Sequence, residues 1–323
     1  MILQLINEYK DIYSKGRLEN RVELDDLYDM AFTKEKELFD MRGFVDSGNC
    51  SALIIDQKGI YGCFEGFSNH EVKMYLDPID KAAVANQLLI QGFYESEEMS
   101  AVNRILRYMD KDSVIFDIGA NLGWYGINIS KLLPDSKVYF FEPVPETIAR
   151  LKNNLMLNDI DTQRVCSCGL YSQNTKSKFY YDVIASGASS LANLKERETT
   201  RVIEVELRRM DDIVREFGIN RLDFIKMDVE GAELYAIQGG EKTIESKLPV
   251  VFTEMLRKWA QKQGYHPNDI IDLMESIGYE CFVISGDKLK RFYKVDKDTI
   301  ETNYFFLHKE KHVRIIAEMT YTL

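Results

Sequence analysis

The segment SVIFDIGANLGWYG, residues 113–126, indicates the architecture of this chain. It opens with a β-branched and aromatic run, which is typical of a strand buried in a sheet. Small residues follow, where a strand has to turn sharply, and a helical pattern then runs from Trp124 to Leu133. A strand, a glycine turn and a helix bring backbone N–H groups and a helix N-terminus to one point. Open α/β sheets bind nucleotide-like ligands at such a point.

The spacing of the glycines narrows the choice of ligand. A dinucleotide fingerprint would need glycine at Asn121 and Trp124, so an NAD-dependent oxidoreductase is disfavoured. Instead, Asp117 stands two residues before Gly119, and Gly123 follows four residues later. A strand-end carboxylate would suit a cationic amino-acid ligand but not a diphosphate. The pattern D-x-G-A-N-x-G resembles the S-adenosylmethionine (SAM) motif of Rossmann-like methyltransferases. The alternative is a plain tight turn in another α/β protein.

Composition excludes several classes of protein. The 323 residues are 45% hydrophobic, which is enough to bury a full core in one large domain or two ordinary ones. The net charge of −11 argues against a nucleic-acid partner, because phosphate binding needs clustered Lys and Arg. The five cysteines lack C-x-x-C spacing, which disfavours zinc and disulfides and fits a reducing cytoplasm. No apolar run approaches the ~18 residues of a membrane span, and residues 1–10 do not resemble a signal peptide. We therefore expect a cytoplasmic protein without a membrane span.

Residues 1–92 are expected to form a smaller α+β accessory unit. The pattern is helical over residues 1–42, and a hairpin is predicted over residues 51–67, followed by a helix over residues 79–91. An apolar stripe in the first region, interpreted as packing, comprises Leu24, Leu27, Tyr28, Ala31 and Phe32. The sequence leaves three roles open for this unit: a lid, a surface for homodimerisation, or a module that binds the acceptor.

Strand and helix signals alternate from residue 93 onward, which predicts an α/β fold with a mainly parallel sheet. The second strand, KVYFFEP at residues 137–143, ends in Glu142, 19 residues past Gly123. Near that offset, α/β nucleotide-binding folds place an acid on the ribose hydroxyls. Two strand-end acids at this separation are more specific than either acid alone.

Two further segments are expected near the ligand. A third strand is predicted over residues 164–170, and its end at Cys168 and Gly169 should lie near the adenine. Residues 182–200 carry small and then charged residues, and we interpret them as a mobile loop. This loop either covers the site or is an ordinary surface connection.

The strand LDFIKMDVEGAE, residues 222–233, carries the charged side chains. Lys226, Asp228 and Glu230 are two residues apart, so an extended chain would place all three on one side. Charges are rarely buried in a central parallel strand, so this cluster needs a reason. It is either a structural ion-pair cluster or an active site at the carboxyl ends of the strands. Another strand, residues 250–254, ends in Glu254 at the same edge.

Taken together, residues 93–285 resemble the FkbM family of SAM-dependent methyltransferases. The motifs that carry the resemblance are Phe93-Tyr94-Glu95, the segment from Asp117 to Gly123, Glu142-Pro143, Met210-Asp211-Asp212, the segment from Ile225 to Glu233, and Glu254. The K-x-D-x-E-G-A-E run is the most specific of these. The resemblance implies a class I methyltransferase domain over residues 93–323, with a Rossmann-like sheet of seven mainly parallel strands. It also implies O-methylation, often of sugars, polysaccharide units or secondary metabolites such as polyketides.

The resemblance and the spacing together suggest roles for single residues. The residues expected to bind SAM are Glu95, Asp117, Gly119, Ala120, Asn121, Gly123, Trp124, Glu142, Pro143, Cys168, Gly169 and Asp228. Methyl transfer requires an aligned acceptor hydroxyl and a base for its proton, for which Asp228 and Glu230 are candidates. Lys226 would stabilise a developing oxyanion or fix a carboxylate. His266 is a weaker candidate base.

Two alternatives stay open at this stage. A divalent metal on Asp228 and Glu254 would find hard oxygen ligands there, although no metal is the main expectation. A SAM-binding scaffold without catalysis would retain the cofactor motif, but it would not need the three aligned charges of residues 226–230.

Overall fold

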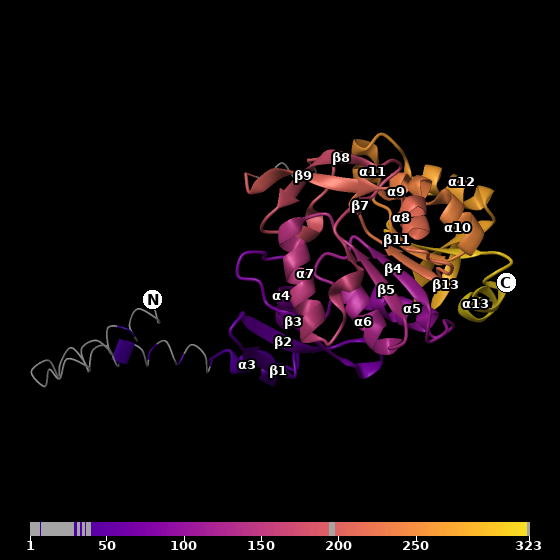
Figure 1. The fold of residues 1–323 in the computed structure, drawn as a ribbon. Helices are drawn as coiled ribbons and strands as arrows, with labels where there is room; N and C mark the ends of the chain where they lie inside the picture. Colours follow the sequence, from indigo (N-terminus) through magenta and orange to yellow (C-terminus); the bar gives the residue numbers. More distant parts are fainter. Residues whose placement is uncertain are drawn as a thin grey trace, which may run out of the picture.

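The computed structural model describes residues 7, 29, 30, 33, 36, 40–193 and 198–321. The apolar stripe expected between Leu24 and Phe32 lies outside these residues. Within the described part, a central sheet carries helices on both faces, which confirms the predicted α/β architecture (Figure 1). No helix in these ranges is both long and apolar enough to cross a membrane.

The central sheet is mainly parallel in the half that carries the sequence motifs. Its strands lie in the order β13 (Lys288–Phe292), β12 (Tyr279–Ser285), β14 (Asn303–His308), β11 (Val250–Glu254), β10 (Phe224–Met227), β4 (Val114–Ile118), β5 (Lys137–Phe141) and β6 (Val165–Cys166). Neighbours from β11 to β6 pair in parallel, whereas β14, β12 and β13 join by antiparallel pairing. The described sheet therefore has eight strands instead of seven. The additional strand, β13, reads KLKRF and buries only Leu289 fully, so it lacks the apolar run of a core strand.

The third strand predicted over residues 164–170 is wrong as one continuous strand. β6 ends at Cys166, and the amide of Cys168 donates to the Cys166 carbonyl at 2.9 Å, which breaks the strand locally. The chain then enters β7 (Gly169–Leu170), which pairs with β9 (Thr200–Arg208) instead of β5. β9 also pairs with β8 (Thr175–Asp182), so these three strands form a separate sheet.

Side chains of β4 alternate between two buried faces, which explains the unbroken apolar run in its sequence. Ile115 packs in one apolar cluster, and Val114 and Phe116 pack in the other. The helices of the first cluster are α4 (Val84–Gln91), α5 (Ser96–Leu106), α6 (Trp124–Leu132), α7 (Pro145–Leu157) and α13 (Val313–Met319). Those of the second are α8 (Met210–Glu216), α9 (Glu233–Gly239), α10 (Glu241–Lys247) and α12 (Pro267–Ser276).

The N-terminal region forms a three-stranded antiparallel sheet. It consists of β1 (Ala52–Ile55), β2 (Ile60–Glu65) and β3 (Glu71–Tyr75), and it follows α3 (Arg42–Asp46). The predicted hairpin is thus confirmed as β1 and β2, and the sequence pattern missed β3. Phe64 and Met74 of this sheet belong to the same apolar cluster as Ile129 and Leu151 of the motif region. The domain boundary expected between residues 92 and 93 stays a prediction.

Candidate active site

A cavity of about 290 Å³ lies at the carboxyl ends of the central parallel strands. Most of the residues singled out from the sequence line it. These are Glu95, Asp117, Gly119, Ala120, Asn121, Trp124, Glu142, Pro143, Gly169, Lys226, Asp228, Glu230 and Glu254. Gly123 and Cys168 are not among the lining residues. Gly123 instead caps the start of α6, and the Cys168 side chain is buried in the second apolar cluster.

The turn after β4 is shaped by close backbone contacts. Gly119 has φ 74°, and a Cβ atom there would overlap the carbonyl oxygen of Asp228. Asn121 follows with φ 47°, a conformation that costs a non-glycine residue energy. The amides of Gly119 and Ala120 both donate to the Phe141 carbonyl at 3.0 Å. These contacts bring the ends of β4, β5 and β10 together at the cavity.

Asp117 is fully buried at the end of β4. One of its oxygens, Oδ2, accepts a hydrogen bond from the Gly126 amide at 2.9 Å and so fixes the first turn of α6. The other, Oδ1, is buried without a hydrogen-bond partner among the described residues, and Asp117 is one of the residues that line the cavity. Burial raises the pKa of Asp117, and the nearby charge of Lys226 opposes that rise.

Glu142 extends from the end of β5 toward the same turn. Its Oε2 accepts from the Asn121 amide at 3.1 Å, and its Oε1 accepts from the Val144 amide at 3.0 Å. Burial raises the pKa of Glu142 to about 7, although both amides favour the ionised form. The carboxylate is therefore held in one orientation beside the β4 turn.

Lys226 supplies a buried positive charge in β10. Its Nζ atom lies 3.7 Å from Asp228 Oδ2 and 4.0 Å from Asp117 Oδ1, and its side chain is 8% exposed. It also lies 5.2 Å from the centre of the Tyr125 ring. Burial alone would lower the pKa of Lys226, but the charges of Asp228 and Asp117 outweigh burial and raise it. Lys226 is therefore charged and neutralises part of the carboxylate cluster.

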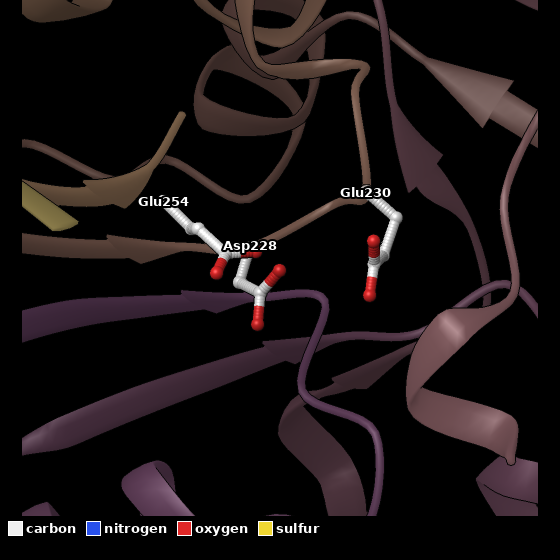
Figure 2. Close-up of side chains that lie close together, drawn as sticks. All are labelled: Asp228, Glu230 and Glu254. Atoms are coloured by element: carbon white, nitrogen blue, oxygen red, sulfur yellow. The ribbon is translucent and has the colours of Figure 1, made fainter. Parts of the chain in front are cut away.

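Three carboxylates, those of Asp228, Glu230 and Glu254, lie close together at this edge of the sheet (Figure 2). One oxygen from each of Asp228, Glu230 and Glu254 lies within 4.8 Å of the other two. The regular strand ends at Met227 and Glu230 has φ 52°, so a turn, and not strand alternation alone, directs Glu230 into the cavity. Burial and the charges of Asp228 and Glu230 raise the pKa of Glu254 to about 9. The three carboxylates can therefore share a proton. Their oxygens are also of the kind that binds a divalent cation such as Mg²⁺ or Ca²⁺.

Glu95 reaches the cavity from the residue before α5. Its backbone has φ 46°, and its carboxylate accepts from the Tyr125 hydroxyl at 2.6 Å. Burial raises the pKa of Glu95, and the charge of Asp228 adds to that effect. The resemblance at residues 93–95 was the only sequence signal for this residue.

Several lining residues belong to none of the sequence motifs. They are Ala82, Val84 and Gln87 before and within α4, Phe179 and Leu207 of the separate sheet, and residues 185–189. The last group belongs to the predicted loop 182–200, so part of this loop does lie over the cavity, whereas its mobility stays a prediction. Residues 194–197 of the loop lie outside the described residues.

His266 has a structural position instead of a place in the cavity. It caps α12, where its Nδ1 atom accepts from the Asn268 amide at 3.2 Å. It follows α11 (Arg257–Lys262) and is not among the residues lining the cavity. The weaker candidate base therefore lies outside the site.

The comparison with known families agrees with this geometry. Residues 117–281, about half of the chain, match the model of the methyltransferase FkbM domain. The chain belongs to this family. The match begins at Asp117 and includes β10 with its charged end, so the motifs from Asp117 to Glu254 lie within the matched region, whereas Phe93-Tyr94-Glu95 precedes it.

Individual relatives match half of the chain or more. The methyltransferase sdnD of Sordaria araneosa is 28% identical over 195 residues, which cover 51% of this chain and 73% of the relative. The 2-O-methyltransferase NoeI of Sinorhizobium fredii is 30% identical over 187 residues, covering 54% of this chain and 76% of the relative. A crystal structure of methyltransferase FkbM from Methylobacillus flagellatus KT is 20% identical with a TM-score of 0.43, covering 69% of this chain and 52% of that one.

Proposed function

We propose that this FkbM-family chain is a SAM-dependent O-methyltransferase that acts on a hydroxyl of a sugar, a polysaccharide unit or a secondary metabolite. The observation that carries the proposal is the cavity in which Asp117, Glu142 and the Lys226–Asp228 pair meet. Family membership supports methyl transfer, and the relative NoeI is described as a 2-O-methyltransferase. Neither an NAD-dependent oxidoreductase nor a non-catalytic scaffold explains all of these features together.

Two buried polar atoms of residues that line the cavity make no hydrogen bond among the described residues and fit the amino-acid end of SAM. Asp117 Oδ1 is an acceptor whose nearest charge is Lys226 Nζ at 4.0 Å, and Trp124 Nε1 is a donor. An ammonium group would suit the first atom and a carboxylate the second. Glu142, held by two backbone amides, would accept from the ribose hydroxyls. These three side chains are therefore the proposed cofactor ligands.

Asp228 is the proposed base. Its Oδ1 atom is buried beside the cavity without a hydrogen-bond partner, while Oδ2 faces Lys226 at 3.7 Å. SAM, when bound, supplies a methyl group already activated on a sulfonium, so the protein has to align the acceptor oxygen and receive its proton. Lys226 Nζ, 3.7 Å from Asp228 Oδ2, orients the carboxylate for this task. Glu254, whose pKa of about 9 keeps it protonated at neutral pH, is a poorer base before the ligands bind.

Calorimetry with S-adenosylhomocysteine and with NADH tests the cofactor assignment. We expect binding of S-adenosylhomocysteine and none of NADH. Glu142→Gln should weaken that binding by about 1.5–3 kcal/mol, because the ribose loses a charge-assisted hydrogen-bond acceptor.

Glu146→Gln is the matched control, because Glu146 is half-exposed in the first turn of α7 and its side chain pairs with Arg201 at 3.0 Å. This control should bind like the wild type. Binding of NADH without binding of S-adenosylhomocysteine would overturn the proposed function.

A further inference from the structure

Two segments outside the family's sequence motifs close one side of the cavity. The first, residues 77–84, leads into α4 and contributes Ala82 and Val84 to the lining. The second, residues 182–191, follows β8 and contributes residues 185–189 and Leu191. Because neither segment has a role in the cofactor motifs, the contacts that hold them in place require an explanation.

Asp80 joins the two segments. Its carboxylate is fully buried, yet Asp80 does not line the cavity. Oδ2 accepts from the Ser186 amide and Oδ1 accepts from the Ala82 amide, each at 3.1 Å. The neighbouring amide of Lys81 donates to the Ile184 carbonyl at 3.1 Å. The loop 182–191 is thus fixed to the N-terminal segment by side-chain and backbone hydrogen bonds.

Arg150 of α7 supplies the counter-charge. Its Nη1 atom lies 3.6 Å from Asp80 Oδ2 and 2.6 Å from Asp77 Oδ2. Its Nη2 atom donates to the Tyr181 hydroxyl at 3.0 Å, near the end of β8. A buried carboxylate with two amide donors and a guanidinium is a fully partnered group, so its removal disturbs all three segments at once.

The same series of hydrogen bonds continues into the turn after β4, residues 119–123, which is called the cofactor turn below. The hydroxyl of Ser186 donates to Asn121 Oδ1 at 3.0 Å. Asn121 holds the left-handed conformation of the β4 turn, and its amide donates to Glu142 at 3.1 Å. Asp80 is therefore connected through Ser186 and Asn121 to the carboxylate proposed to hold the ribose.

We infer that Asp80 is a positioning residue for the cofactor. By holding Ser186 over the cavity, it orients Asn121 and Glu142 and keeps the loop 182–191 against the bound molecule. This inference rests on the proposed function, and it assigns to the N-terminal region a part in completing the cofactor site. Its main effect is on the rate at which the cofactor leaves the cavity.

Asp80→Asn is the decisive variant, because Asp80 cannot contact the ligand directly. Both carboxylate oxygens face an N–H donor, so an amide would have to turn its own NH₂ group toward one of them. We expect the Kd for S-adenosylhomocysteine to rise about 10-fold, mostly through faster dissociation, as for a lost hydrogen bond to a charged group.

Ser186→Ala removes the next link and should raise the Kd about 3- to 10-fold, as for a neutral hydrogen bond. Ser190→Ala is its matched control, since Ser190 is a buried serine of the same loop whose hydroxyl donates to Ala192 instead of the cofactor turn. Its Kd should stay at the wild-type value. Because Asp80 and Ser186 act through one series of hydrogen bonds, the double variant should have a Kd for S-adenosylhomocysteine only slightly above that of Asp80→Asn alone.

Stopped-flow and calorimetric measurements on the full chain, made well below each melting temperature, separate the outcomes. Unchanged dissociation in Asp80→Asn, or equal effects of Ser186→Ala and Ser190→Ala, would overturn the inference. Fully additive losses of binding free energy in the double variant would also overturn it. Additivity would mean that the two residues act independently, as in a general loss of stability, and not through one series of hydrogen bonds. If the wild type itself does not bind S-adenosylhomocysteine, the proposed function fails instead.

Discussion

Lys226 is the one cation among the described residues that line the cavity, and several carboxylates surround it. Its side chain is 8% exposed, whereas that of Asp228 is 33% exposed. If Asp228 loses its charge, the ammonium of Lys226 still has a second carboxylate nearby, because Asp117 Oδ1 lies 4.0 Å from Lys226 Nζ. Neutralising Asp228 therefore leaves the ammonium with a partner, so its effects on catalysis and on stability can be separated.

Asp228→Asn should keep the shape of the site but lose the proton acceptor. We expect methyl transfer to fall by about 10²–10⁴-fold, with affinity for S-adenosylhomocysteine nearly unchanged. Turnover, cofactor affinity and melting temperature of Asp228→Asn and Glu230→Gln would be measured with an acceptor on which the wild type is active. Normal turnover in Asp228→Asn would contradict its role as base. A loss of about 3–5 kcal/mol of stability would instead indicate a structural ion-pair cluster.

Glu254 makes the stability of the folded chain depend on pH. Burial, with the charges of Asp228 and Glu230, raises the pKa of Glu254 from 4.5 to about 9. Between these values the folded state keeps a proton that the unfolded state has released, so the free energy of unfolding decreases as pH rises. Glu254→Gln mimics the protonated form and should remove this dependence. Urea unfolding of both proteins should show that the free energy of unfolding of the variant increases relative to that of the wild type as pH rises from about 5 to about 9. A pH-independent difference would refute the assignment.

At the scale of elements, α6 lies unusually close to the sheet. A Cβ atom at Gly126 would overlap the Phe140 ring of β5 and come within 2.8 Å of Asp117 Oδ2. The absence of a side chain at Gly126 lets the helix bring its first turn to the cavity, where Asp117 receives the Gly126 amide. The position of the helix N-terminus therefore depends on one small residue inside the helix.

Gly126→Ala should push α6 away from β5, because the new methyl group overpacks this contact. We expect a loss of about 1–3 kcal/mol in the free energy of unfolding, measured by urea denaturation. Gly43→Ala in α3 is the control, since no atom lies within 4 Å of its Cβ position. There the substitution should be neutral or stabilise the helix by up to about 1 kcal/mol. Equal effects at both sites would show that packing on β5 is not the cause.

At the scale of the whole molecule, Asn154 of α7 and Asn158, which caps the end of α7, join the N-terminal sheet to the domain that carries the cofactor motifs. Asn158 accepts from the Lys73 amide at 2.9 Å and donates to the Lys73 carbonyl at 2.6 Å. Asn154 accepts from the Tyr75 amide at 3.0 Å and donates to the Leu122 carbonyl at 2.9 Å. These amide side chains pair with the backbone of β3 as a neighbouring strand would. The N-terminal sheet and the turn after β4 are therefore both hydrogen-bonded to the C-terminal part of α7.

Asn158→Ala should leave two backbone groups of β3 without partners. We expect a loss of about 1–3 kcal/mol, measured by chemical denaturation with probes in both regions. Asn153→Ala, on the same helix, removes only a 3.5 Å contact with exposed Lys58 and should change stability by less than about 0.5 kcal/mol. Indistinguishable losses in the two variants would mean that the side-chain pairing with β3 contributes little.

The sequence by itself determined the parts of the site that lie on consecutive residues. The strand–turn–helix around Gly119, the acid after β5 and the charged end of β10 were predicted because strand periodicity and glycine turns leave a local pattern. The carboxyl ends of parallel strands meet at one edge, so the convergence of Asp117, Glu142 and Lys226 also followed from the pattern.

Only the tertiary structure decided which distant segments close the cavity. Asp80 and Ser186 are 106 residues apart and meet through a hydrogen bond from a backbone amide, which every residue except proline supplies and no sequence pattern marks. The same holds for β7, which leaves the line of β6 and pairs with β9, a strand about 30 residues later in the chain. Such pairings depend on where the folded chain brings backbone groups together, whereas periodicity records only the face that each element buries.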